Sequence, residues 1–180
     1  MSAGDAAAAV PARARSIAID AALRAELDAL YADYAAALDE RRYDDWVELF
    51  ADDCQYLLQP RENHDRGLPL ATLALEGKGM LRDRVYGITQ TLFHAPYYQR
   101  HVIGPLRVVG LERSGGAAPQ CIDVHANYAV LRTKVQQPSE VFNVGRYVDR
   151  LVATDDGWRF QRKRAIFDSE LIPNSIIYPI

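Results

Sequence analysis

The sequence predicts an α+β domain in which a curved antiparallel sheet wraps around a long N-terminal helix. Apolar residues recur at every third or fourth position in the first third of the chain, and they alternate with polar residues in long runs after Pro96. Turn-forming residues separate those later runs, as they do in a meander of antiparallel strands. Because such a sheet buries one face, the preceding helices are expected to cover it.

Two helices are expected before the first strand. The first is long, is capped by Asp20, and has an apolar stripe made of Leu23, Leu27, Leu30, Tyr31, Tyr34 and Leu38. The second is short and carries Asp44 and Asp45 near its start, where the helix dipole favours negative charge. Its apolar stripe consists of Tyr43, Trp46, Val47 and Phe50.

A strand, a loop, a second strand and a helix are expected next. Cys54, Tyr56 and Leu58 alternate with polar residues, and Pro60 ends this strand. Residues 61–69 are polar and predict an exposed loop, and residues 70–75 predict a short strand. The helical spacing then returns in Leu81, Val85, Ile88 and Leu92.

Four long strands are expected after Pro96, over residues 99–111, 122–135, 140–153 and 158–168. The segments between them, 114–119 (SGGAAP), 136–139 (QQPS) and 155–157 (DDG), are rich in turn residues. These strands complete the predicted meander.

Length and composition indicate one domain. The chain has 180 residues, of which 49% are hydrophobic, and this is enough for one substantial core. We expect a single domain over residues 20–180, preceded by an alanine-rich tail, residues 1–19, that is disordered or loosely held. The net charge of −3 is mixed along the chain, so neither nucleic acid nor membrane is an expected partner. No secretory or membrane-spanning pattern is present, and a cytoplasmic location is expected.

Motifs for catalysis or cofactor binding are absent from the sequence. A Rieske cluster needs two Cys-x-His pairs, and neither Cys54 nor Cys121 has a histidine two or three residues later. The sequence also lacks a Gly-x-Ser-x-Gly elbow and a glycine-rich phosphate loop. We therefore assign no catalytic, cofactor-binding or metal-binding residue, and read both cysteines as small buried apolar residues.

Polar residues on the predicted strands leave two interpretations open. Strand periodicity is expected to point three sets into the concave face: Asp123, His125 and Asn127; Tyr147 and Asp149; and Arg162, Arg164 and Asp168. In the first interpretation, His101, His125 or Asp149 is an acid–base group in an apolar cone. In the second, which we favour, Asp149 forms an ion pair with Arg162 or Arg164 that fixes strand register or faces a partner.

Several segments resemble one family in their order and spacing. They are residues 45–50 (DWVELF), 53–56 (DCQY), 80–84 (MLRDR), 100–104 (RHVIG) and 145–150 (GRYVDR). Taken together, these segments make the chain from about residue 23 onward resemble the small (beta) subunits of Rieske-type aromatic-ring-hydroxylating oxygenases. Residues 62–68 (ENHDRGL) most resemble members that act on aromatic carboxylates, with terephthalate dioxygenase first and salicylate hydroxylase and anthranilate dioxygenase close behind.

The resemblance implies a cystatin-like, NTF2-type cone and a structural role. It implies a hexamer of three large and three small subunits, in which the small subunits form a trimer. The large subunit would hold a Rieske 2Fe–2S cluster and a mononuclear Fe(II), and a reductase would reach the assembly through it. This chain would carry no cofactor and be inactive alone.

Candidate interface residues follow from composition at segments expected on the surface. Residues 94–101 contain two tyrosines, an arginine and two histidines, a mixture enriched at protein interfaces, although the tyrosines could equally pack on the core. We also expect contacts from the loop at residues 62–68 and from residues 171–180. The predicted interface set is Asn63, His64, Asp65, Arg66, Tyr97, Tyr98, Arg100, His101, Arg146 and Tyr178. The alternative function is a stand-alone NTF2-like lyase or isomerase, or a ligand-binding protein.

Overall fold

The computed structural model describes residues 15–113, 118–169, 171 and 175–180. Its helices are α1 (Ala21–Asp39), α2 (Tyr43–Glu48), α3 (Arg61–Asp65) and α4 (Gly77–Tyr86), which continues into the π-helical turn η1 (Gly87–Thr91). Its strands are β1 (Phe50–Pro60), β2 (Leu73–Glu76), β3 (Tyr97–Ile103), β4 (Arg107–Glu112), β5 (Cys121–Lys134), β6 (Glu140–Thr154) and β7 (Gly157–Phe167). The predicted α+β class is confirmed.

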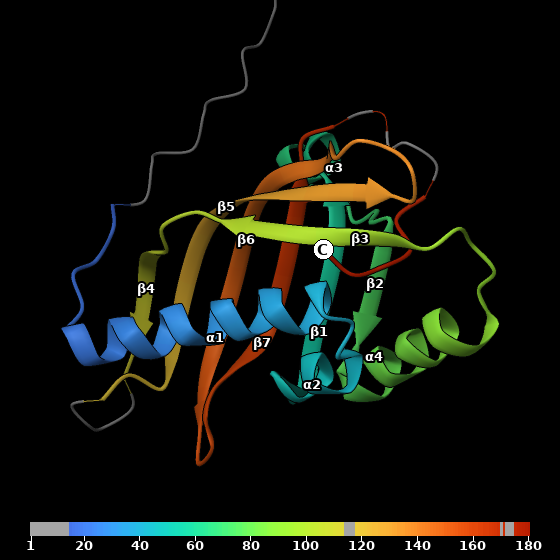
Figure 1. Cartoon of the computed structure of the whole chain (residues 1–180). Helices are drawn as coiled ribbons and strands as arrows, with labels where there is room; N and C mark the ends of the chain where they lie inside the picture. The colour runs from blue at the N-terminus through green and yellow to red at the C-terminus, as the bar shows by residue number, and fades with distance from the viewer. Residues whose placement is uncertain (1–14, 114–117, 170, 172–174) are drawn as a thin grey trace, which may run out of the picture.

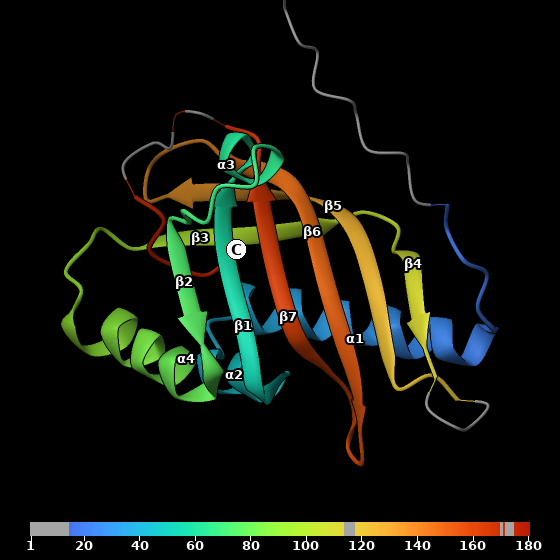
Figure 2. The ribbon, with the colours of Figure 1, turned by 180° about the vertical axis from the view of Figure 1, so that it is seen from behind.

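The described strands form one strongly curved sheet of order β2-β1-β7-β6-β5-β3, with β4 also paired to β5. All neighbouring pairs are antiparallel except β1 and β7, which run parallel. The predicted meander is therefore correct for the later strands, and β1 joins it at β7 through a long connection. In Figure 1 α1 crosses the concave face, and in Figure 2 the opposite face of the sheet is turned to the viewer.

The helix α1 supplies the centre of the core, as predicted. Asp20 caps it, because its Oδ1 accepts a hydrogen bond of 2.8 Å from the Leu23 amide. The predicted stripe packs under the sheet, and Leu27 and Tyr34 are completely buried. Each such side chain contributes about 2 kcal/mol of burial free energy.

Two predicted elements differ from the structure for local backbone reasons. The run 99–111 is two strands, because the chain breaks at Gly104 and Pro105 between β3 and β4. Pro105 has no amide hydrogen to continue the ladder, and the Gly104 amide instead donates to the Asn127 carbonyl at 2.8 Å. The predicted loop 61–69 contains the short helix α3, which starts directly after Pro60.

Two of the three polar sets predicted to face the cone point the other way. On β5 the alternating residues Val124, Ala126 and Tyr128 are buried, so Asp123, His125 and Asn127 lie on the outer face. On β7 a bulge changes the phase: Arg150 pairs with Arg162 and Leu151 with Phe160, which leaves Gln161 as an extra residue. Lys163 therefore faces the interior, while Arg162 and Arg164 face outward. Tyr147 and Asp149 are buried as predicted.

Only part of the predicted N-terminal tail is described. Residues 1–14 lie outside the described residues. Further along, the Ile17 amide donates to the Val108 carbonyl at 2.7 Å, and Ile19 packs against the core. Among the described residues, no helix is long and apolar enough to cross a membrane.

Candidate functional site

A buried ion pair lies inside the cone, between β6 and β7. Lys163 Nζ is 2.8 Å from Asp149 Oδ2, and both side chains are inaccessible to solvent. The Tyr31 hydroxyl donates to the same carboxylate oxygen at 2.6 Å, and the Arg164 amide donates to Asp149 Oδ1 at 3.2 Å. The predicted ion pair of Asp149 therefore exists, but the predicted partners Arg162 and Arg164 are wrong because the bulge turns Lys163 inward.

Aromatic rings close around this lysine. Its Nζ lies 3.4 Å from the centroid of Tyr147 and 4.4 Å from that of Tyr34, and the rings of Phe160 and Tyr31 follow at 4.7 and 4.8 Å. Burial lowers the pKa of Lys163 to about 8, against the opposing effect of the Asp149 charge. The same burial raises the pKa of Tyr31 and of Tyr147. The cluster is enclosed in the core: the Asp149 carboxylate accepts from Tyr31, Lys163 and the Arg164 amide, while the Tyr147 hydroxyl is buried without a hydrogen-bond partner among the described residues.

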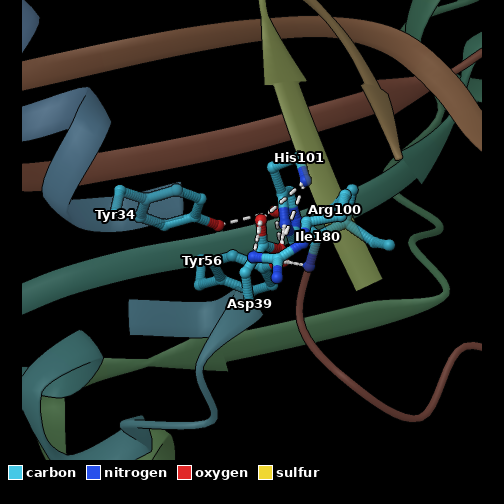
Figure 3. A network of polar contacts seen from close by, with 6 residues as sticks. All are labelled: Tyr34, Asp39, Tyr56, Arg100, His101 and Ile180. Atoms are coloured by element: carbon cyan, nitrogen blue, oxygen red, sulfur yellow. Dashed lines mark hydrogen bonds and ion pairs between the residues drawn. The ribbon is translucent and has the colours of Figure 1, made fainter. Parts of the chain in front are cut away.

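A second polar network joins the end of α1 to β3 and to the C-terminal segment (Figure 3). Asp39 Oδ1 lies 2.7 Å from His101 Nδ1, and both carboxylate oxygens accept from the His101 amide, at 3.2 and 3.0 Å. Beside it, the hydroxyls of Tyr34 and Tyr56 donate to the Ile180 carbonyl at 2.6 and 3.0 Å. These contacts fix β3 and the final residues against the helix.

The structure divides the predicted residues of β3 and the C-terminal segment into buried and exposed groups. Tyr97 and Tyr178 are buried with ring centroids 4.6 Å apart, and the side chain of His101 is inaccessible. In the free chain their side chains pack beneath the surface. Tyr98 is 65% exposed and the Arg100 side chain 71% exposed. Residues 172–174 of the predicted C-terminal contact lie outside the described residues.

The predicted residues around α3 are brought together with Arg146 of β6. Asp65 Oδ1 lies 3.3 Å from Arg146 Nη2, and Asn63 Nδ2 donates to the Leu70 carbonyl at 3.1 Å. Burial, followed by the charges of Arg146 and Arg164, lowers the pKa of His64. Arg66 forms a separate surface ion pair with Glu62 at 2.8 Å.

The acid–base interpretation finds little support in the positions of its candidates. His125 lies on the outer face, and Asp149 is enclosed in its ion pair. A pocket of about 570 Å³ beside α1 is lined in part by Tyr31, His101 and Leu106. The His101 side chain is inaccessible to solvent in this structure, and its Nδ1 is bonded to Asp39.

Metal ligation by this chain is equally unsupported. Across residues 15–113, 118–169, 171 and 175–180, no three His, Cys, Asp or Glu side chains gather in a way that could hold a metal ion. Burial raises the pKa of the Cys54 thiol to about 11, which disfavours the thiolate that a cluster would need. The donor set of the described chain does not fit an iron–sulfur cluster.

The sequence reasoning missed Lys163 and Asp39, both of which are central to the polar core. Lys163 carried no usable signal, because its inward position depends on the bulge at Gln161. Asp39 lies at the end of the helical stripe, where a carboxylate next to a predicted helix end could have been paired with His101.

Comparison with known proteins decides the family. Residues 34–174 match the family model described as the ring hydroxylating beta subunit. The chain belongs to this family. The anthranilate 1,2-dioxygenase small subunit of Burkholderia cepacia is 35% identical over 147 residues, which cover 82% of this chain and 88% of that protein. The subunit beta 2 of the terephthalate 1,2-dioxygenase terminal oxygenase component of a Comamonas species is 26% identical, over 86% of this chain and 97% of that protein.

Solved structures agree with this family and with the predicted cone. A candidate beta subunit of an aromatic-ring-hydroxylating dioxygenase from Novosphingobium aromaticivorans superposes with a TM-score of 0.77 and 31% identity, over 88% of this chain and 97% of that chain. A Nostoc punctiforme protein with a cystatin-like fold has a TM-score of 0.60 at 15% identity, over 86% of this chain and 98% of that one, and supports the fold alone.

Proposed function

We propose that this beta subunit is a component of the terminal oxygenase of a ring-hydroxylating dioxygenase that acts on an aromatic carboxylate. The observation that carries the proposal is the family match over residues 34–174. Two relatives belong, by name, to dioxygenases of anthranilate and of terephthalate, both of which are aromatic carboxylates. The relative named for anthranilate is the more similar of the two, so anthranilate-like substrates now stand beside the terephthalate-like ones that the sequence suggested.

The role of the chain in this proposal is assembly. Three copies would form a base for three large subunits, and the large subunits would hold the Rieske cluster and Fe(II) and receive electrons from a reductase. Those groups supply electron transfer and oxygen activation. This chain contributes a rigid support, because its polar groups Asp149 and Lys163 are paired inside the core and its rim is fixed by the contact between Asp39 and His101.

Co-expression tests the proposal. The chain is produced with the large subunit encoded in the same genome, and a tag on this chain is used for capture. We expect an iron-containing complex with the mass of three copies of each subunit that hydroxylates anthranilate or terephthalate. A lone chain that turns over a substrate, or a large subunit that assembles and works fully without this chain, would contradict it.

A further inference from the structure

The outer face of the sheet, opposite α1, carries a cluster of arginines that we call the arginine face: Arg107, Arg146, Arg150, Arg162 and Arg164. Residues in register share a face, and Arg162 lies beside Arg150 on β6 and Gln55 on β1. Arg164 is in register with Leu57. Figure 2 shows these strands in front, with α1 behind them. No described helix other than α3, at one end, lies on this side.

Carboxylates of the same chain neutralise only some of these side chains. Arg150 forms ion pairs with Glu112 and, at 3.4 Å, with Asp123. Arg146 is 3.3 Å from Asp65. By contrast, within the described part of the chain the guanidinium groups of Arg162 and Arg164 have neither an ion pair nor a hydrogen-bond acceptor, and the Nε of each is buried without a partner.

The resulting positive field is unfavourable for the isolated chain. Burial, followed by the charge of Arg162, lowers the pKa of Arg164. Burial and then the charges of Arg107 and Arg146 lower the pKa of His125 on the same face. This face is positive although the whole chain has a net charge of −3. Partly desolvated guanidinium groups gain most from a bidentate carboxylate, so the arrangement fits an acidic partner.

An apolar strip continues the arginine face across β3, β5 and β6. Val102 is in register with Ala129, and Leu131 with Val141. Val102 is 56% exposed and Val141 64% exposed. Apolar area flanked by arginine is typical of protein interfaces. Two copies that met through this same face would place arginine against arginine, which disfavours a symmetric self-contact.

We infer that the arginine face docks an acidic segment of the large subunit, whose carboxylates pair with Arg162 and Arg164. This inference rests on the proposed function and adds the face and the chemistry of the contact. It also implies that the two unpaired arginines destabilise the free chain and gain carboxylate partners only in the complex.

Two double variants test it against a matched control. Arg162→Gln/Arg164→Gln removes both charges, and Arg162→Lys/Arg164→Lys keeps the charges without the planar fork. The control is Arg24→Gln/Arg42→Gln, which removes two exposed arginines from the helical side. For each protein, the dissociation constant of its complex with the large subunit is measured at several salt concentrations, and the isolated chain is unfolded in urea.

The glutamine variant should bind the large subunit at least about tenfold more weakly, with a smaller salt dependence, while its free chain is as stable as the wild type or more so. The affinity of the lysine variant should lie between those of the glutamine variant and the wild type. The control should bind as tightly as the wild type. Unchanged binding by the glutamine variant would overturn the inference and leave the proposed function standing. A loss of its folded state, or of self-association alone, would also overturn it. Failure of the wild type to bind any large subunit would instead remove the proposed function itself.

Discussion

Lys163 brings a charged group into an interior otherwise made of aromatic rings. Burial removes water from Lys163 and Asp149, and the attraction between them offsets only part of the lost solvation free energy. The pKa of the lysine is accordingly lowered. The Tyr31 hydroxyl and the Arg164 amide satisfy the remaining carboxylate positions. At the residue scale, we therefore expect the pair to add little stability relative to two apolar side chains of similar size.

Replacing Lys163 with methionine should destabilise the chain by about 3–5 kcal/mol, because it leaves the Asp149 charge buried without its counter-charge. Adding Asp149→Asn should recover much of this loss, since the amide oxygen still accepts from Tyr31. Urea unfolding of both variants measures the effect. Equal loss in the single and double variants would show that the charge is not the cause.

The same lysine predicts a pH dependence with a defined sign. Its pKa is about 8 in the folded chain, below the ordinary value of 10.5, so between these values the unfolded chain binds more protons. The free energy of unfolding should therefore rise as pH increases from about 8, until the buried tyrosines reverse the trend above about pH 10. Urea unfolding at pH 7.5, 8.5 and 9.5 should show the rise in the wild type and in Lys134→Met. If the rise also occurred in Lys163→Met, Lys163 would not be its cause.

Residue 145 must be glycine, because the neighbouring strand leaves no room for a side chain. A Cβ at Gly145 would lie 2.0 Å from the Ile166 carbonyl oxygen and 2.9 Å from the Phe167 Cα, both of them backbone atoms of the neighbouring strand region. Gly145→Ala should cost about 3 kcal/mol or more, because β6 and β7 must separate. Gly79→Ala in α4, where nothing lies within 4 Å, should be neutral or stabilising. Thermal unfolding distinguishes the two.

At the scale of elements, α1 depends on its cap and on the stripe beneath the sheet. Asp20→Ala should lower the free energy of unfolding by about 0.5–2 kcal/mol, since the Leu23 amide loses its acceptor. Asp28→Ala breaks only an exposed ion pair with Arg24 and should change it by less than about 0.5 kcal/mol. Chemical denaturation of both variants measures the two changes. Equal changes would show that the Asp20 cap does not stabilise α1.

The bulge in β7 is the element with the largest consequence for the interior. It shifts the alternation by one residue after Phe160, which places Lys163 inside and delivers Arg162 and Arg164 to the outer face. One extra residue thus places Lys163 in its buried ion pair and the charges of Arg162 and Arg164 on the outer face.

At the scale of the whole molecule, we propose that the exposed side chains of Tyr98 and Arg100 on β3 contact another subunit. Tyr98→Ala/Arg100→Ala removes two side chains that lie at the surface, so the free chain should keep its stability while the proposed hexamer dissociates more easily. Native mass measurement over a dilution series tests this, with the similarly exposed Tyr86→Ala as control. An unchanged mass at every dilution would exclude these residues from the contact.

The sequence by itself determined the elements that depend on neighbours in the chain. The cap and stripe of α1, the short α2 and the run of later strands follow from spacing, because a helix or strand repeats its contacts at a fixed period. The order of local motifs also pointed to the family that the comparisons show.

Only the tertiary structure decided which strand faces meet the core and which strands pair. The parallel pairing of β1 with β7 and the bulge at Gln161 depend on contacts between residues far apart in the chain. A slip of one residue exchanges the two faces of a strand, so Lys163 and the outer arginines could not be assigned from periodicity.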